Sequence, residues 1–114
     1  MSASRFKLAL AQQNFRVGDV AANLRCMQEC TQVARDAQAD LIVFPELALV
    51  GYPPEDLLFH RGLRSRVDAA LSELAAAASG IALLTGYPEY DQSAIYNTAV
   101  VFSDRREIAR YRKQ

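Results

Sequence analysis

The chain has 114 residues, of which 51% are hydrophobic and 23% are charged, and this composition is typical of one modest globular domain. Its 13 basic and 13 acidic residues cancel, which excludes a bulk electrostatic attraction to nucleic acid or to an anionic membrane. No apolar run has the length of a membrane span or the form of a secretory signal. Two cysteines do not make a disulfide framework, so we expect a cytoplasmic protein.

The first half of the chain predicts a strand, a helix and a second strand. Residues 7–12 form a short apolar run that predicts a strand. Residues 20–39 carry apolar side chains at helical spacing, and Asp19 is suited to cap this amphipathic helix. Residues 41–44 are fully apolar, as in a strand buried on both faces. This order predicts a right-handed βαβ unit.

The second half adds one main helix and three strands. In order, we expect a loop at 45–54, a short helical turn at 55–59, a helix at 62–79, a strand at 81–86, a loop at 87–92, a strand at 94–102, a hairpin turn at 103–106 and a strand at 107–111. The fold class is therefore α/β, with an antiparallel pair at its end.

The last predicted strand begins close to Gln114, so its sheet would lack a pairing partner and an outer layer. A sheet without its outer layer keeps an open edge and an uncovered apolar face. We therefore expect residues 1–114 to be an incomplete domain.

Two charged residues follow predicted strands, where ligand crevices form in open α/β sheets. Glu46 comes directly after the buried strand and a proline, and a carboxylate held there could serve as a general base. Lys113 follows the last strand, and an ammonium group there could stabilise a negatively charged intermediate. Taken alone, each is explained more simply as a solvated charge at a strand end.

The other reactive residue types give no comparable signal. Cys26 and Cys30 lie one helical turn apart, neither follows a strand, and a core thiol is the simpler explanation for Cys30. His60 is the single histidine, which leaves too few ligands for a metal site. The glycines, Gly86 among them, are each explained by a turn or by a helix end.

The residues around Glu46, taken together with other segments of the chain, resemble a known family. Residues 43–47, Val-Phe-Pro-Glu-Leu, resemble the first signature of the carbon–nitrogen hydrolase superfamily, also called nitrilases. Residues 6–12, 96–102 and 110–113 resemble its opening strand, the strand before its hairpin and the segment of its catalytic lysine. The resemblance implies that residues 1–114 are the N-terminal portion of a nitrilase-type α-β-β-α sandwich. Because such a sandwich cannot close with half of its strands missing, we expect the isolated chain to aggregate or to remain molten.

One segment is similar to a particular branch of this family. Residues 51–58, Gly-Tyr-Pro-Pro-Glu-Asp-Leu-Leu, resemble the corresponding segment of glutamine-dependent NAD synthetases. This implies that Glu46 is the general base, that Lys113 stabilises the tetrahedral intermediate and that Tyr52 lies in the glutamine pocket. The nucleophilic cysteine of the family would follow a later strand, beyond Gln114. We therefore expect these 114 residues to be inactive by themselves.

The resemblance also implies partners and cofactors. The substrate would be glutamine, and hydrolysis of its amide would need no cofactor or metal. ATP and Mg²⁺ are implied only for a synthetase domain outside these residues, which would convert deamido-NAD to NAD. The full-length form would be a homo-oligomer, without nucleic acid or membrane as partners.

Two alternatives stay open. The first is a truncated stand-alone nitrilase-family amidase or carbamoylase, and the second is a non-catalytic binding module that pairs through its open edge. The sequence downstream would discriminate, because only a synthetase should continue into a domain with a Ser-Gly-Gly phosphate loop.

Overall fold

The computed structural model describes residues 5–51, 62–92 and 94–113. In chain order its elements are β1 (Leu8–Leu10), α1 (Val20–Asp36), β2 (Leu41–Val43), α2 (Leu63–Ala77), β3 (Ala82–Asp91), β4 (Ala94–Ser103) and β5 (Arg106–Arg112). The predicted α/β class is confirmed. The helical turn expected at 55–59 lies outside the described residues.

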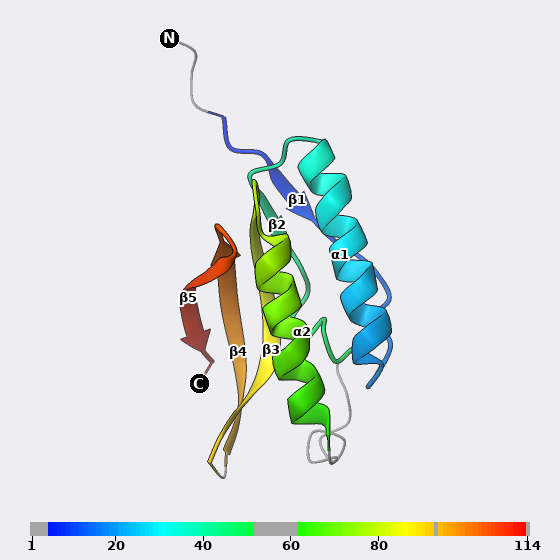
Figure 1. The fold of residues 1–114 in the computed structure, drawn as a ribbon, viewed down its shortest axis with the longest axis vertical. Coiled ribbons are helices and arrows are strands. Elements are labelled where there is room, and N and C mark those ends of the chain that lie inside the picture. Colours follow the sequence, from blue (N-terminus) through cyan, green and yellow to red (C-terminus); the bar gives the residue numbers. More distant parts are fainter. Residues whose placement is uncertain (1–4, 52–61, 93, 114) are drawn as a thin grey trace.

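One sheet holds the described strands in the order β1-β2-β3-β4-β5. The first three strands are parallel, whereas β4 is antiparallel to both β3 and β5. The helices α1 and α2 pack side by side on one face of this sheet (Figure 1). The described part of the chain therefore forms two layers, one of helices and one of strands.

Local signals explain where the helices begin and end. Asp19 caps α1, since its Oδ1 accepts a hydrogen bond from the main-chain N–H of Ala22 at 3.1 Å. The helix ends at Asp36, earlier than predicted, because the chain turns at Gln38 with a left-handed φ of 63°. Neither described helix has the length and apolar character needed to cross a membrane.

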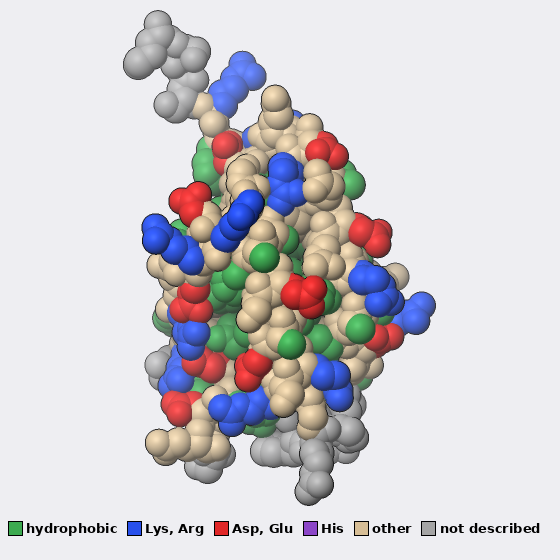
Figure 2. Space-filling view, in the orientation of Figure 1, with side chains coloured by type: hydrophobic (Ala, Val, Ile, Leu, Met, Phe, Trp, Pro, Cys, Tyr) green, Lys and Arg blue, Asp and Glu red, His purple; other side chains and the backbone are tan. Residues whose placement is uncertain are grey.

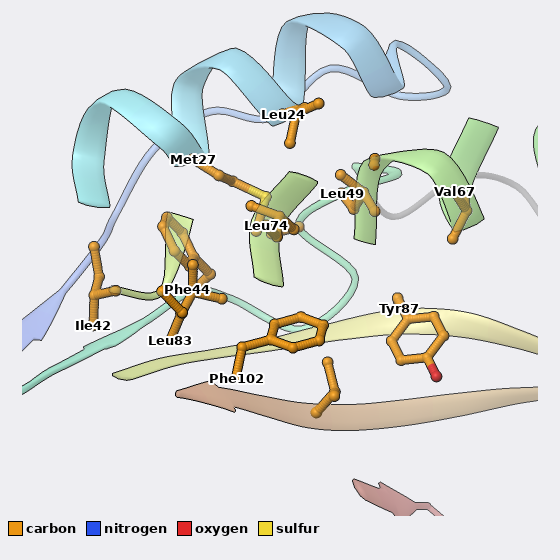
Figure 3. Close-up of a cluster of buried hydrophobic side chains, with 14 of the residues drawn as sticks. Leu24, Met27, Ile42, Phe44, Leu49, Val67, Leu74, Leu83, Tyr87 and Phe102 are labelled. Carbon is orange, nitrogen blue, oxygen red and sulfur yellow. The ribbon is translucent and has the colours of Figure 1, made fainter. Parts of the chain in front are cut away.

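The core lies between the helices and the sheet. Helix side chains point toward the sheet, and strand side chains point back at them (Figure 3). The buried members labelled there include Leu24, Met27, Val67 and Leu74 from the helices, and Ile42, Leu83, Tyr87 and Phe102 from the strands. Burial of these side chains holds the two layers together.

The opposite face of the sheet is also apolar. Strand register aligns Leu10, Val43, Leu84 and Val101 in one row, and side chains alternate between the two faces of a strand. Because the neighbouring row faces the helices, this one faces away from them. Tyr111 lies on the same face, since it pairs with Ala99, which pairs with Gly86, two residues along from Leu84. Leu10 is 65% exposed and Tyr111 is 63% exposed. We call this surface the helix-free face.

One element differs from its prediction. Residues 87–92 were expected to form a loop, but Tyr87 to Asp91 continue β3 and pair with the first half of β4. The prediction was wrong because this stretch contains a proline and acidic side chains, which are typical of loops. Those acidic side chains are paired with arginines of β5.

Candidate active site

Strand directions bring the residues after β2 and β5 to the same end of the sheet. β3 runs parallel to β2, and two antiparallel pairings from β3 through β4 return β5 to that direction. Glu46 follows β2, and Lys113 directly follows β5. Both residues therefore leave the sheet at its same end, as the sequence interpretation required.

Two strands separate β2 from β5, and Gly86 in β3 lets the loop after β2 pass over the sheet. A Cβ atom on Gly86 would lie 3.0 Å from the main-chain N of Leu47 and 3.4 Å from the Cα of Glu46. A glycine inside a strand often marks such a close approach of backbone. Explaining Gly86 by a turn was wrong, because it lies within β3.

The side chains of Glu46 and Lys113 form an ion pair. Lys113 Nζ lies 2.8 Å from Glu46 Oε1, and the two side chains are 46% and 33% exposed, respectively. Asn97 of β4 also donates to Glu46 Oε1 through its amide nitrogen. The main-chain N–H of Lys113 donates to the main-chain O of Asn97 at 2.8 Å. A carboxylate, an ammonium and an amide thus converge on the helix-free face.

A cavity of about 180 Å³ opens beside Glu46. It is lined by the loops that follow β1 and β2: Gln13, Asn14, Phe15, Pro45, Glu46, Leu47, Ala48 and Gly51. The buried amide of Asn23 joins these loops, since its nitrogen donates to the main-chain O of Arg16 at 2.7 Å and of Leu49 at 3.0 Å. The walls of the cavity are therefore fixed by a residue of α1.

A charged network holds the end of β5 beside this site. Glu89 of β3 accepts hydrogen bonds from Arg112 Nε at 2.9 Å, from Arg110 Nη1 at 2.5 Å and from the Thr98 hydroxyl at 2.9 Å. The bond from Arg112 lowers the pKa of Glu89 to about 2, and Thr98 and Arg110 add to this effect against the opposing effect of burial. Acidic and basic side chains mix over β5 in Figure 2.

The two cysteines lie elsewhere, on α1, as free and half-buried thiols. Burial raises the pKa of Cys30 to about 11, and the neighbouring Cys26 adds to the rise. Such a thiol is almost fully protonated at neutral pH and is a poor nucleophile. Neither cysteine lines the cavity beside Glu46. The sequence interpretation gave them no catalytic role, and this stays a prediction.

Other predicted site features have different outcomes. Tyr52 and His60 lie outside the described residues, so the proposed glutamine-pocket role of Tyr52 stays a prediction. Within the described ranges, no group of three or more His, Cys, Asp or Glu side chains is arranged to hold a metal ion. Sequence reasoning missed Asn97 and Gly86. A glycine inside an apolar run was the available signal for Gly86, and Asn97 gave none.

The chain is similar in sequence to known proteins of one family. Residues 7–114 match the model of the carbon-nitrogen hydrolase family. The glutamine-dependent NAD(+) synthetase of Xanthomonas campestris pv. campestris (strain 8004) is 42% identical over 115 aligned positions, which cover 100% of this chain and 21% of that protein. The chain spans about a fifth of the length of the curated synthetases it matches.

Solved structures of proteins from this family have a fold similar to that of the chain. A glutamine-dependent NAD+ synthetase from Acinetobacter baumannii has a TM-score of 0.88 at 35% identity, covering 95% of this chain and 20% of that one. An amidase from Nesterenkonia sp. has a TM-score of 0.89 at 29% identity, covering 99% of this chain and 44% of that one. Both likenesses confirm the fold expected from the resemblance.

Proposed function

Because the chain belongs to the carbon–nitrogen hydrolase family, we propose that Glu46 and Lys113 take part in hydrolysing a carboxamide, and that this carboxamide is the side chain of glutamine. The observation that carries the proposal is the 2.8 Å contact between Lys113 Nζ and Glu46 Oε1. The two residues come from segments far apart in the sequence and meet beside a cavity. Acyl transfer uses a general base and a group that stabilises the developing oxyanion, and a carboxylate beside an ammonium can supply both.

The proposed chemistry needs a thiol in addition. A cysteine sulfur from another part of the full-length protein attacks the amide carbon while Glu46 accepts the thiol proton. Lys113 stabilises the negative oxygen of the tetrahedral intermediate. The C–N bond then breaks, and the proton on Glu46 passes to the leaving ammonia. Water next attacks the thioester with Glu46 again as the base, which releases glutamate and restores the thiol.

Glutamine is the proposed substrate because synthetases that match along 96% to 100% of this chain are named as glutamine-dependent. In this proposal Tyr52 lines the glutamine pocket, and the hydrolysis step uses no cofactor. The released ammonia would serve an ATP- and Mg²⁺-dependent synthetase domain that converts deamido-NAD to NAD. We further propose that the full-length protein is cytoplasmic and homo-oligomeric.

The proposal includes the helix-free face of the sheet. We propose that residues 1–114 are the first part of a larger hydrolase domain whose remaining strands cover this face. The exposed side chains of Leu10 and Tyr111 support this proposal, since a folded domain rarely leaves a broad apolar surface open to water. Coverage of only 44% of the amidase chain supports it as well.

A second candidate function is a stand-alone amidase. The observation in its favour is the likeness to the Nesterenkonia amidase along 99% of this chain. It differs from the first candidate in substrate, because a simple amidase would accept short aliphatic amides and would need no ATP.

The test measures two products of the full-length protein that carries this segment. We expect glutamate release from glutamine, little ammonia release from propionamide, and glutamine-driven amidation of deamido-NAD when ATP is added. Rapid hydrolysis of propionamide without hydrolysis of glutamine would favour the amidase. Hydrolysis of neither amide would contradict an enzymatic role and favour a binding module.

A further inference from the structure

Asn97 contacts both members of the charged pair. Its amide nitrogen donates to Glu46 Oε1, which is also the oxygen that Lys113 Nζ approaches to 2.8 Å. Its main-chain carbonyl accepts a hydrogen bond from the main-chain N–H of Lys113 at 2.8 Å. One residue in the middle of the sheet thus links the loop after β2 to the end of β5.

We propose that Asn97 is a positioning residue, which orients the Glu46 carboxylate and registers it against Lys113 for amide hydrolysis. The inference deepens the proposed function and rests on it. Asn97 acts through these two residues and needs no contact with the substrate.

The ion pair alone does not fix the orientation of the Glu46 carboxylate. The attraction between Lys113 Nζ and Glu46 Oε1 depends on the distance between the charges and hardly on direction, so it does not by itself fix the rotation of the carboxylate. A hydrogen bond is directional, and its donor here comes from a paired strand, which is more rigid than a loop. The amide of Asn97 therefore restricts the rotation of the carboxylate that would accept the thiol proton.

The carbonyl oxygen of the Asn97 side chain indicates that fold stability is not the reason for an asparagine at this position. This Oδ1 atom is buried and has no hydrogen-bond partner in the part of the chain that the structure describes. A buried acceptor without a partner lowers the stability of the fold. An apolar side chain of similar size would avoid this cost, so we infer that the amide is present for its contact with Glu46.

The substitution Asn97→Leu in the full-length protein separates the two contacts. It removes the side-chain donor and leaves the main-chain bond to Lys113 intact. We expect kcat for glutamine hydrolysis to fall about 10- to 100-fold, because small displacements of a catalytic group have effects of this size. KM for glutamine, amidation with free ammonia and the melting temperature should change little.

Val101→Ala is the matched control. Val101 lies on β4, on the same face as Asn97, and pairs with Leu84 and Ala109 rather than with the residues of the site. It should lower the melting temperature and leave kcat within about two-fold of wild type, as expected for a purely structural change. Asn97→Ser, whose hydroxyl is too short to reach Glu46, provides a second variant if Asn97→Leu does not fold.

The outcomes separate this inference from the proposed function. A wild type that hydrolyses glutamine, with Asn97→Leu at full kcat, would overturn the role of Asn97 alone. A fall in kcat that comes with a lower melting temperature in Asn97→Leu, and that Val101→Ala shows to the same extent, would also overturn it. A wild type that releases no glutamate would overturn the proposed function and this role together. A selective fall in kcat at unchanged KM supports both.

Discussion

Gly86 shows how one missing side chain permits the site. The backbone of Glu46 and Leu47 passes over Gly86, so the loop can carry the carboxylate from β2 toward Asn97 and Lys113. Any side chain at this position would occupy the space of that loop. The site therefore depends on a residue that contributes no functional group.

We predict that Gly86→Ala lowers kcat for glutamine hydrolysis about 10-fold or more in the full-length protein. The added methyl would lie 3.0 Å from the Leu47 nitrogen, so the loop must shift by a few tenths of an ångström and move Glu46 with it. Steady-state kinetics would measure the change. Gly80→Ala is the control: a Cβ there meets nothing within 4 Å, and the strain that its left-handed φ of 75° places on an alanine should lower stability without moving Glu46. An equal loss of kcat in both variants would contradict the prediction.

Glu89 is the charged residue whose ionisation holds β5 in place. Its pKa is lowered from 4.5 to about 2 in the folded chain, with the hydrogen bond from Arg112 as the main cause. Because the pKa of Glu89 is lower in the folded chain than in the unfolded chain, ionised Glu89 stabilises the fold. This stabilisation is complete at pH values above the unfolded pKa and is lost as the pH falls to the folded pKa. The window is therefore about pH 4.5 down to about pH 2.

We predict that β5 opens more readily across this window. Amide hydrogen exchange of residues 110–113 in the full-length protein, corrected for intrinsic rates, should lose protection on the order of 3 kcal/mol as Glu89 takes up its proton. Glu89→Gln should begin with lower protection at pH 5 and show little further loss from this group. Parallel pH curves for the wild type and the variant would contradict the assignment.

At the scale of elements, local signals predicted most of the fold. The helical spacing after Asp19, its N-cap and the apolar run at β2 are all encoded within a few residues of where they act. The hairpin turn was also predicted, and Asp104 and Arg105 adopt left-handed φ values of 54° and 65° there. Such short-range features can be predicted without knowledge of distant contacts.

The wrong or missing predictions concern residues whose structure depends on contacts with residues far away in the sequence. Tyr87 to Asp91 were predicted as a loop, because their charges gain partners only when β5 returns beside β4. The contact of Asn97 with Glu46 likewise depends on how a loop crosses the sheet. Glu46 and Lys113 were identified through a family resemblance, since spacing alone left each of them as a solvated charge.

At the scale of the whole molecule, the uneven covering of the sheet is the main feature. One face packs against α1 and α2 (Figure 1), while apolar side chains such as those of Leu10 and Tyr111 are exposed on the helix-free face. The charged pair and Asn97 lie on this same helix-free face. Whatever covers the apolar surface would therefore also enclose the site and exclude water from it.

We predict that isolated residues 1–114 aggregate or form a molten state. An uncovered apolar face should bind the dye ANS, and heating should give no sharp cooperative transition by circular dichroism. Leu10→Lys combined with Tyr111→Glu should reduce both dye binding and aggregation, because it places charges on that face. A sharp thermal transition without dye binding in the unmodified chain would contradict the prediction.

The central claim is that Glu46 accepts the proton in glutamine hydrolysis, and the most direct test compares two nitrogen sources in the full-length protein. With Glu46→Gln we predict that NAD formation from glutamine falls about 10²- to 10⁴-fold, the range for loss of a general base, while formation from free ammonia is retained. The control Glu73→Gln, on the exposed surface of α2, should leave both rates unchanged. Wild-type use of glutamine by Glu46→Gln would contradict the account.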